Sequence, residues 1–533
     1  MRNIKLLDCT LRDGGFVNDW NYGHTVIRDI ISRLDLAEID IIEIGYLNEK
    51  EESNKDRTIF PNTESAEKFF ENISLKNAMA VAIIDYGNCS IDNIGPCKES
   101  TLNGIRVTFK KHEIDNAMEF CSHIKAKGYK VFAQPVSFTS YSDMEVLSLV
   151  EKVNKLKPYA ISIVDTYGLM LKKDLIRSYY LLDHNLIDSI RIGYHSHNNY
   201  QLAFSNCAEL VDSISVSRNI ILDATLLGMG KSAGNAQIEL IANYLNSEYL
   251  HNYNINQLLE IIDLYISPIY QQTPWGYRIE FFISASNDCH YQYVKDLIGK
   301  NTLSIKSINE IIAMIDDSDK LTYKNGLIEH LYLQYQQKQI NDEYACNWLK
   351  SYIKGKRVLI LAPGSTLTSH REAILQYIEK NSPIIFSTNF IPYDYAVDCL
   401  FVGNAKRYGK ILDTYKKAFK QPIILATSNI TESATPIDYV FNYSSLILDE
   451  IEILDNSTLM FLQLLVKIGV EEVALAGFDG FSISSKTLNY ADKSMLVAAS
   501  EEKMDVDNQL IKCKIQTLRN MLDLKFITPS RYE

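Results

Sequence analysis

The segment SIRIGYHSHNN (residues 189–199) runs from an apolar stretch directly into a cluster of polar and histidine side chains. Residues 189–195 predict a short β-strand. Seven further segments of the first 230 residues have the same character: 4–9, 39–46, 78–85, 104–109, 129–137, 160–165 and 220–226. Most of these runs are almost continuously apolar, which is typical of parallel strands covered on both faces.

Helical patterns separate several of the predicted strands. The clearest ones cover residues 24–36, 113–127, 143–156, 173–184 and 200–213. Eight strand–helix units in about 230–250 residues match a (β/α)8 TIM barrel. An open, doubly wound parallel sheet is the alternative.

Composition limits the classes of protein to consider. The chain has 533 residues, of which 46% are hydrophobic, and this excludes low-complexity disorder. The formal net charge of −12 argues against nonspecific binding to nucleic acid or to an anionic membrane. Nine cysteines are scattered without a C-x-x-C pair, and charged residues stand at the start of the chain. Together with the lack of an apolar run of about 18 residues, these features predict a cytoplasmic protein without a membrane span.

The pattern changes twice after the barrel. Residues 256–352 predict a helical extension, which could supply the interface of a homo-oligomer. Residues 353–533 return to strand–helix alternation, with strands expected at 357–361, 384–387, 399–402, 423–426, 439–442 and 473–476. We therefore expect an α/β protein with a TIM barrel over residues 1–255, the helical extension, and a C-terminal Rossmann-like domain.

Polar residues follow the predicted barrel strands at the end where TIM barrels place their chemistry. His195 and His197 stand two residues apart in an extended segment, so both imidazoles face the same side. Asp13, which follows the first strand, is the natural carboxylate partner. Two imidazoles and one carboxylate form a site with open positions, suited to Mn²⁺, Mg²⁺, Fe²⁺ or Zn²⁺. The alternative is a pair of ordinary surface or core histidines.

Three neighbouring features could complete this site. Arg12 could bind a substrate carboxylate or an enolate oxygen, or Arg12 and Asp13 could form a structural ion pair or a helix cap. Glu43 ends an apolar strand, where an unpaired carboxylate is costly, so we expect it to pair with Arg12, to support the metal or to serve catalysis. The glycine-rich segment GMGKSAGN (228–235) is either a phosphate cradle or a tight turn, and Asn235 could add a metal ligand.

Together these motifs resemble the DRE-type metal-dependent TIM-barrel lyases, which include HMG-CoA lyase and 4-hydroxy-2-oxovalerate aldolase. The resemblance covers roughly residues 1–330 and rests on DCTLRDGG (8–15), IEIG (42–45), DTYG (165–168), YHSHNN (194–199) and GMGKSAGNAQIE (228–239). It implies that Asp13, His195 and His197 hold Mn²⁺ or Mg²⁺, which chelates a 2-oxo acid. It also implies that Arg12 stabilises the enolate oxygen while a general base serves the hydroxyl of the aldol partner.

One position departs from this family. The hydroxyoxovalerate aldolases carry a catalytic histidine three residues after the metal-binding aspartate, where this chain has Phe16. Either the base has moved or the reaction differs. The candidate bases are His24, Tyr46, Tyr194 and His290.

The C-terminal part carries a weaker indication of a ligand. A strand and glycine turn within residues 357–367 could bind phosphate through backbone amides, with Gly364, Ser365 and Asn389 as contacts, although ordinary βα turns have the same pattern. This part resembles the Rossmann-like domain of bacterial sialyltransferases and motility-associated glycosylation proteins, except that Ala362 replaces the first glycine of their G-x-G-P-S-L turn. The resemblance implies a nucleotide or nucleotide-sugar partner and a role in surface-polysaccharide or sugar-acid biosynthesis.

We therefore expect a carbon–carbon lyase that makes or breaks a bond next to the enolate of a 2-oxo acid such as pyruvate, with an aldehyde or acyl acceptor. Two alternatives stay open. One is an acyl-CoA-dependent Claisen-type synthase of the same superfamily. The other is a non-catalytic barrel scaffold whose C-terminal domain binds a nucleotide sugar.

Overall fold

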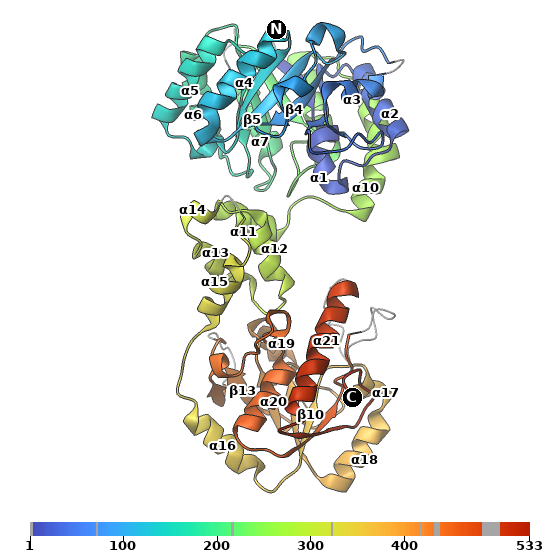
Figure 1. The fold of residues 1–533 in the computed structure, drawn as a ribbon, viewed down its shortest axis with the longest axis vertical. Helices are drawn as coiled ribbons and strands as arrows, with labels where there is room; N and C mark the ends of the chain where they lie inside the picture. The colour runs from blue at the N-terminus through green and yellow to red at the C-terminus, as the bar shows by residue number, and fades with distance from the viewer. Residues whose placement is uncertain are drawn as a thin grey trace. The chain divides into compact units, whose positions relative to one another are not determined.

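The chain forms two compact units, Met1–Tyr291 and Gln292–Glu533 (Figure 1). The computed structural model describes residues 4–70, 73–214, 218–320, 323–415, 418, 420–430, 437–481 and 501–533. The residues expected to form the helical extension are divided between the two units.

Eight parallel strands of the first unit close into a barrel. β1 (Ile4–Asp8) pairs with both β2 (Ile41–Leu47) and β9 (Ile220–Ala224), and this double pairing closes the sheet. The other strands follow in chain order: β4 (Met79–Asp85), β5 (Gly104–Phe109), β6 (Lys130–Pro135), β7 (Ala160–Asp165) and β8 (Arg191–Ser196). The TIM-barrel prediction is confirmed, and the open sheet is excluded for this unit.

Helices surround the barrel, and α4, α5 and α6 lie side by side on its outer face (Figure 1). The periodicity of the sequence places α2 and α5 correctly to the residue. The helices of this unit are α1 (Gly15–Asn18), α2 (His24–Leu36), α3 (Thr63–Glu67), α4 (Ile114–Ala126), α5 (Asp143–Leu156), α6 (Lys172–Asn185), α7 (Ala203–Ser213), α8 (Ile238–Tyr249), α9 (Ile255–Ile261), α10 (Ser267–Gln272) and α11 (Ile279–Ser286).

The inside of the barrel changes from apolar to charged along the strands. Successive strand residues point to opposite faces, so Ile42 packs toward the helices whereas Ile41 and Glu43 point inward. One inward layer is apolar and includes Leu7, Ile41, Val81, Phe132 and Ile221. The next inward positions toward the carboxyl ends include the charged or titratable residues Glu43, Arg106, His195 and Asp223, all buried. The interior is therefore apolar in the first of these layers and charged toward the carboxyl ends of the strands.

A short ninth strand, β3 (Ile59–Phe60), extends the sheet beside β2. The pairing of β2 with β4 shifts register between Glu43 and Tyr46. Gly45, at φ 150°, permits this arrangement, because a Cβ there would lie 2.0 Å from the carbonyl oxygen of Thr58. The loop before β3 therefore packs directly against the end of β2 that carries Glu43.

The second unit contains a seven-stranded parallel sheet in the order β14-β13-β12-β11-β10-β15-β16. Strand order reverses between β10 and β15, which is where open α/β sheets form a crevice. The strands are β10 (Val358–Leu361), β11 (Ile384–Thr388), β12 (Cys399–Val402), β13 (Ile423–Thr427), β14 (Tyr439–Phe441), β15 (Glu472–Ala476) and β16 (Asp523–Phe526). The second half of the fold prediction, a parallel α/β sheet, is thus confirmed.

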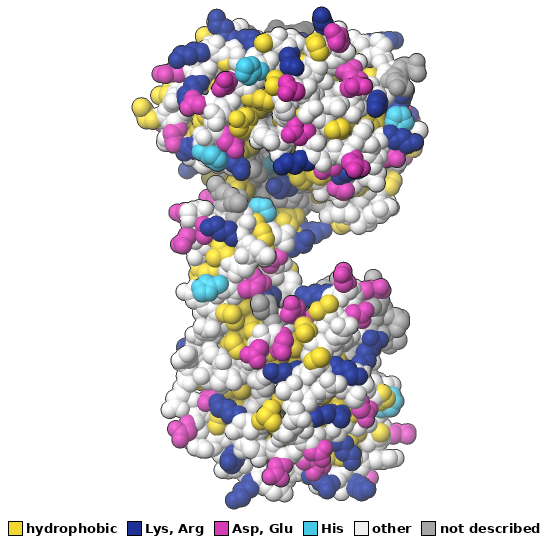
Figure 2. All heavy atoms as spheres, viewed as in Figure 1, with side chains coloured by type: hydrophobic (Ala, Val, Ile, Leu, Met, Phe, Trp, Pro, Cys, Tyr) yellow, Lys and Arg dark blue, Asp and Glu magenta, His cyan; other side chains and the backbone are white. Residues whose placement is uncertain are grey.

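Helices accompany this sheet and precede it. They are α12 (Tyr291–Gly299), α13 (Ile305–Ala313), α14 (Asp317–Lys320), α15 (Leu327–Gln336), α16 (Glu343–Ile353), α17 (Thr366–Ser369), α18 (Arg371–Asn381), α19 (Ala405–Tyr415), α20 (Ser457–Lys467) and α21 (Glu501–Leu518). On the faces visible in Figure 2, acidic and basic side chains are interspersed over both units. In the described part of the chain, every helix is too short or too polar to span a bilayer.

Candidate active site

Three buried side chains converge at the carboxyl ends of β1 and β8. Asp13 lies on the helical turn Thr10–Gly14 that follows β1. His195 is in β8, and His197 is the first residue after that strand. One ligand atom from each residue lies within 4.8 Å of the other two. The Asp13 Oδ2 atom is 3.2 Å from His195 Nε2 and 3.9 Å from His197 Nε2. The i, i+2 spacing of the histidines therefore does place both rings beside one carboxylate.

The donor set fits a divalent cation. His195 binds Asp223 through Nδ1, at 3.1 Å from Oδ2, and this contact leaves Nε2 directed at Asp13. Asn235 donates its Nδ2 to the carbonyl of Met229, while its buried Oδ1 has no hydrogen-bond partner among the described residues. A Cβ on Gly230 would lie 2.1 Å from Asn235 Nδ2 and 3.1 Å from Asp13 Oδ1. Glycine at 230 thus lets the Asn235 loop approach the cluster.

Charged side chains around the cluster form a closed ring, which we call the ion ring: Arg12, Glu43, Arg106, Asp223, His195 and Asp13. Arg12 donates to Asp13 at 2.7 Å and to Glu43 at 2.5 Å. Glu43 accepts from Arg106 at 2.9 Å, and Arg106 continues to Asp223. Asp223 and Asp13 then both contact His195, which completes the ring. Buried charges require such partners, because an isolated one loses its hydration without compensation.

The pKa values of Asp13 and His197 favour the protonation states that bind a metal. Burial raises the pKa of Asp13, but Arg12 and the two histidines outweigh it, so the pKa lies well below its ordinary value. Burial is also the largest influence on His197 and lowers its pKa to about 4. For His195, burial lowers the pKa, but hydrogen bonds with Asp13 and Asp223 leave it above the ordinary value. The cluster therefore offers a carboxylate and a neutral imidazole at neutral pH.

Aromatic side chains and a lysine lie beside the cluster. Phe16 is 44% exposed, and its ring meets that of Trp20 edge-on at 4.8 Å and that of Tyr46 at 6.3 Å. The exposed Lys231 places its Nζ 5.6 Å from the Phe16 ring, and its backbone N–H donates to Asp13 Oδ1 at 3.2 Å. A substrate at Asp13 would therefore meet an apolar wall together with one positive charge.

The barrel carries Asp13, His195 and His197 at the carboxyl ends of its strands, and Asp13 belongs to the sequence DCTLRDGG. This combination points to one family. Residues 3–264 match the sequence profile of the HMGL-like family. The N-terminal part of the chain is HMGL-like.

Curated relatives of this HMGL-like barrel include two enzymes that cleave 2-oxo acids. Oxaloacetate decarboxylase of Mycobacterium tuberculosis is 26% identical over 278 residues, which is 52% of this chain and 79% of that protein. 4-Hydroxy-2-oxovalerate aldolase of Thermomicrobium roseum is 26% identical over 278 residues, or 51% of this chain and 75% of that protein. The solved N-terminal domain of a candidate aldolase from Bacteroides vulgatus is 26% identical, with a TM-score of 0.48 over 57% of this chain and 99% of that chain.

Two of the expected catalytic residues lie apart from the cluster in the HMGL-like barrel. Tyr194 points to the helix side of β8, where its hydroxyl bonds Ser196 and Asn206. His24 begins α2, and its ring packs 5.4 Å from that of Phe69. Neither is brought together with Asp13.

Other expected residues are brought to the cluster or its edge. Arg12 and Glu43 belong to the ion ring, and the Arg12 guanidinium lies 5.9 Å from the Tyr46 ring centre. Burial raises the pKa of Tyr46 above its ordinary value, so its hydroxyl stays protonated at neutral pH and no phenolate is available as a base. His290, which is partly buried, lies in the electrostatic field of Lys231, and burial lowers its pKa.

Sequence reasoning missed two members of the ion ring, Arg106 and Asp223. Each stands alone inside an otherwise apolar strand, IRVTF and IILDA, and both are about 1% exposed. Both residues could have been found in the sequence, because a charged residue within a buried strand needs a partner. Glu43 was identified as a candidate by the same reasoning.

The expected phosphate cradle after β10 is filled by the protein itself. The Asp479 carboxylate accepts the backbone N–H of Thr366 at 2.9 Å, the Ser365 hydroxyl at 3.3 Å and the Thr366 hydroxyl. Gly364 donates its N–H to the carbonyl of Gly477, and a Cβ on it would lie 2.4 Å from the Asp479 carboxyl carbon. The turn at Gly364 and Ser365 is therefore closed, because an acidic side chain occupies the place expected for phosphate.

Proposed function

We propose that the barrel is a divalent-metal-dependent carbon–carbon lyase that acts on a 2-oxo acid. The observation that carries this proposal is the convergence of Asp13, His195 and His197 within 4.8 Å at the carboxyl ends of the barrel strands. The relatives named as a 2-oxo acid aldolase and an oxaloacetate decarboxylase support the same reaction class.

Asp13, His195 and His197 would hold Mn²⁺ or Mg²⁺, with Asn235 as a further oxygen ligand. When bound, the cation supplies a Lewis acid for the carbonyl oxygen of the 2-oxo acid. Asp223 fixes His195 by accepting from Nδ1, and such outer contacts orient metal ligands. The ion ring therefore holds the ligand atoms in place before substrate arrives.

Arg12 would stabilise the negative charge that develops as the carbon–carbon bond breaks. Its Nε and Nη1 are held by Glu43 and Asp13, so the guanidinium has a fixed orientation. Its Nη2 has no hydrogen-bond partner in the described part of the chain and is the donor that an enolate oxygen would meet. A positioned donor of this kind lowers the barrier without reorganising during the reaction.

Two carbon–carbon lyase reactions are candidates, aldol cleavage and decarboxylation, and Phe16 favours decarboxylation. An aldol cleavage needs a base for the substrate hydroxyl, and an apolar ring stands where the resembling aldolases carry histidine. A β-carboxylate is already ionised: its C–C bond breaks, CO₂ leaves, the electron pair forms the enolate, and the enolate then takes a proton. This reaction needs no such base, so oxaloacetate-like acids fit the site as well as hydroxy-2-oxo acids.

The decisive experiment measures metal content and enolate chemistry in the full chain. We expect about one Mn²⁺ per chain, and exchange of the pyruvate methyl protons with deuterium followed by NMR. Asp13→Asn and His195→Ala should abolish both, with at least about a thousandfold loss of exchange, since the metal contributes several kcal/mol. His184→Ala, which changes an exposed histidine on α6, is the matched control.

Product assays separate the alternatives. CO₂ release from oxaloacetate above the rate with Mn²⁺ alone identifies a decarboxylase, and aldehyde release from a 4-hydroxy-2-oxo acid identifies an aldolase. Thiol release from acetyl-CoA would instead identify a Claisen-type synthase. Metal content and exchange equal in wild type, Asp13→Asn and His195→Ala would reject the metal lyase and favour the scaffold.

A further inference from the structure

A cavity of about 630 Å³ lies in the second unit at the carboxyl ends of four strands. Its wall includes Gly364 after β10, Asn389 after β11, Asn404 after β12 and Gly477 after β15. These strands flank the reversal of strand order between β10 and β15, the common ligand position of open α/β sheets. The volume falls within the range of small-molecule sites, roughly 300–1,000 Å³.

Helix α20 begins at this cavity, and its first residues line the wall. The N–H groups of Ser457 and Thr458 are at the helix start, where no preceding turn supplies an acceptor. Asn389 joins this helix to the sheet: its Nδ2 donates to the Ser457 hydroxyl at 2.6 Å, and its Oδ1 accepts from the backbone N–H of Gly403 at 3.2 Å. The helix start is thus held rigidly against the ends of β11 and β12.

Asn404 supplies an independent sign of a ligand next to this helix start. The residue is 7% exposed and lines the cavity, and its Oδ1 accepts the backbone N–H of Arg407 at 3.1 Å. Its Nδ2 has no hydrogen-bond partner among the described residues. This amide donor is accessible from the cavity, so a ligand oxygen there could accept from it. The buried Arg407, also on the wall, adds positive charge.

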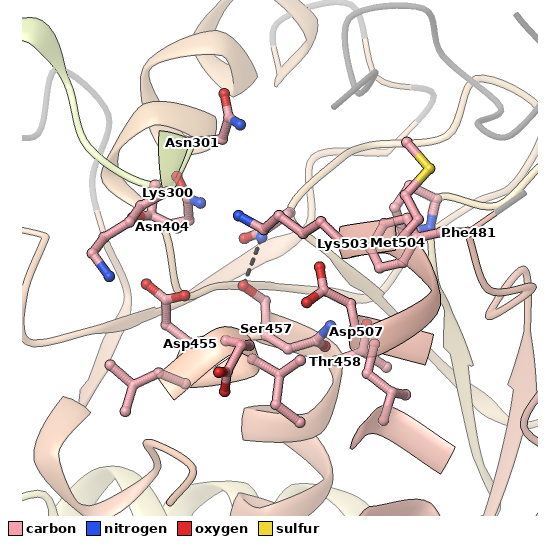
Figure 3. A pocket seen from close by; sticks show the side chains of 18 of the residues that line it. Lys300, Asn301, Asn404, Asp455, Ser457, Thr458, Phe481, Lys503, Met504 and Asp507 are labelled. Carbon is pink, nitrogen blue, oxygen red and sulfur yellow. Dashed lines mark hydrogen bonds between the residues drawn. The ribbon is translucent and has the colours of Figure 1, made fainter. Parts of the chain in front are cut away.

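The opposite parts of the wall mix acids and lysines. Figure 3 shows Lys300 and Asp455 on one side, and Lys503 and Asp507 on the other. The Asp507 Oδ1 atom is buried and has no hydrogen-bond partner in the described residues. Carboxylates in a cavity accept from hydroxyl groups, whereas a purely anionic ligand would be repelled by them. This wall therefore suits a polyhydroxylated group.

We propose that this cavity binds a phosphorylated sugar, either free or as the ribose phosphate of a nucleotide. The phosphate lies at the start of α20, with Asn404 and Arg407, because helix N-termini favour anions. The sugar hydroxyls face the wall that carries Asp455 and Asp507. The phosphate does not lie at the turn after β10, because Asp479 fills it. This site is separate from the barrel cluster and does not depend on its chemistry.

The test uses isothermal titration calorimetry on the full chain with ribose 5-phosphate, glucose 6-phosphate and AMP as probes. Inorganic phosphate and ribose serve as partial ligands. The titrations are carried out in EDTA and repeated with Asp13→Asn, so that binding at the barrel is excluded. We expect saturable binding of at least one sugar phosphate, at least about tenfold tighter than of phosphate or ribose alone. The ranking of AMP against the two free sugar phosphates identifies the source of the ligand.

Two variants and one control locate the phosphate. Asn404→Asp keeps an oxygen for the Arg407 N–H but replaces the Nδ2 donor by a negative charge, so we expect binding at least about tenfold weaker. Lys503→Met removes the charge of an exposed side chain on the cavity wall, and should weaken binding by about threefold. Ser365→Ala, in the closed turn, should bind as wild type does.

Three outcomes would overturn the proposal. One is the absence of heat with all three probes at millimolar concentration. Another is binding that disappears in Asp13→Asn, which would assign it to the barrel. The third is a loss of affinity in Ser365→Ala while Asn404→Asp and Lys503→Met bind normally, which would place the phosphate at the turn after β10.

Discussion

The two parallel sheets of this chain both collect polar side chains where their strands end, but they use them differently. In the barrel, six side chains bond to one another in the ion ring, and three ligand atoms lie within 4.8 Å of one another. In the C-terminal sheet, the corresponding side chains border a cavity of about 630 Å³. The barrel cluster has room for a single ion, whereas the cavity of the second unit has room for a small molecule.

This difference follows from how each sheet ends. Closing a barrel directs the inward side chains of all strands toward one axis, where they must neutralise one another. An open sheet offers a crevice only where strand order reverses, and helices form its other walls. Equivalent strand-end residues therefore form an ion-sized cluster in one unit and border a ligand-sized cavity in the other.

Breaking the ion ring should have the largest effect. Arg106→Met would leave Glu43 and Asp223 buried without their shared cation, and we expect the barrel to lose about 3–5 kcal/mol of stability. Differential scanning calorimetry should show a lower barrel transition, identified by its upward shift with Mn²⁺, and an unchanged transition for the second unit. Arg177→Met, which removes an exposed pair with Asp143, is the control and should cost less than about 1 kcal/mol. If both variants lower the transition temperature of the barrel by the same small amount, the ion ring contributes little to the stability of the barrel.

Asp223→Asn tests whether the ring serves the metal as well as the fold. It removes the negative charge that His195 Nδ1 contacts, and we expect Mn²⁺ affinity to fall by about 10- to 100-fold. Competition with a fluorescent chelator measures this change. Asp40→Asn, at a carboxylate that pairs with Lys5, should leave the affinity unchanged. An Asp223→Asn protein with wild-type affinity would restrict the ring to a structural role.

The barrel should also depend on pH through Asp8, which lies outside the ring. Burial, opposed by hydrogen bonds from Thr10, raises the pKa of Asp8 to about 7. The folded state thus holds this proton more tightly than the unfolded chain, so the stability it contributes is complete below about pH 4 and is lost as pH rises through 7. Asp8→Asn should remove about 2.5 kcal/mol of the fall in barrel stability between pH 5 and 8. Parallel pH profiles of the two proteins, measured by urea unfolding, would contradict this assignment.

The smallest effect is expected in the closed turn of the second unit. Thr366→Val removes a hydroxyl that donates to Asp479, and we expect a loss of about 1 kcal/mol confined to that unit's transition. Thr368→Val, two residues further along, is the control. A shift in the barrel transition instead would contradict the division into separate units.

Periodicity predicted the architecture well because both sheets are parallel and buried. Such strands read as continuous apolar runs, and β5, β7 and β12 match their expected bounds to the residue. β3 was missed because two residues carry no pattern, and β16 because DLKF alternates charge with apolar residues at a sheet edge. The expected domain boundaries and the C-terminal family resemblance stay predictions.

The candidate site was predictable only where its residues are close in sequence. The His195–His197 pair and the Arg12–Asp13 pair can be read from local spacing. The partners of Arg106 lie 63 and 117 residues away, so no local pattern could identify them. The same limit applies to Asp479, which is 113 residues from Thr366 and closes a turn that looks open in the sequence.

The ion ring also has a consequence for how this barrel can evolve. Each side chain of the ring contacts two others by an ion pair or a hydrogen bond. A single substitution therefore leaves a buried charged group without one of its partners. Substitutions inside the ring would have to arise in compensating pairs, whereas Phe16 and Lys231, at the exposed edge, can change one at a time. New substrate preferences should therefore appear first through those two positions, while the charged interior stays fixed.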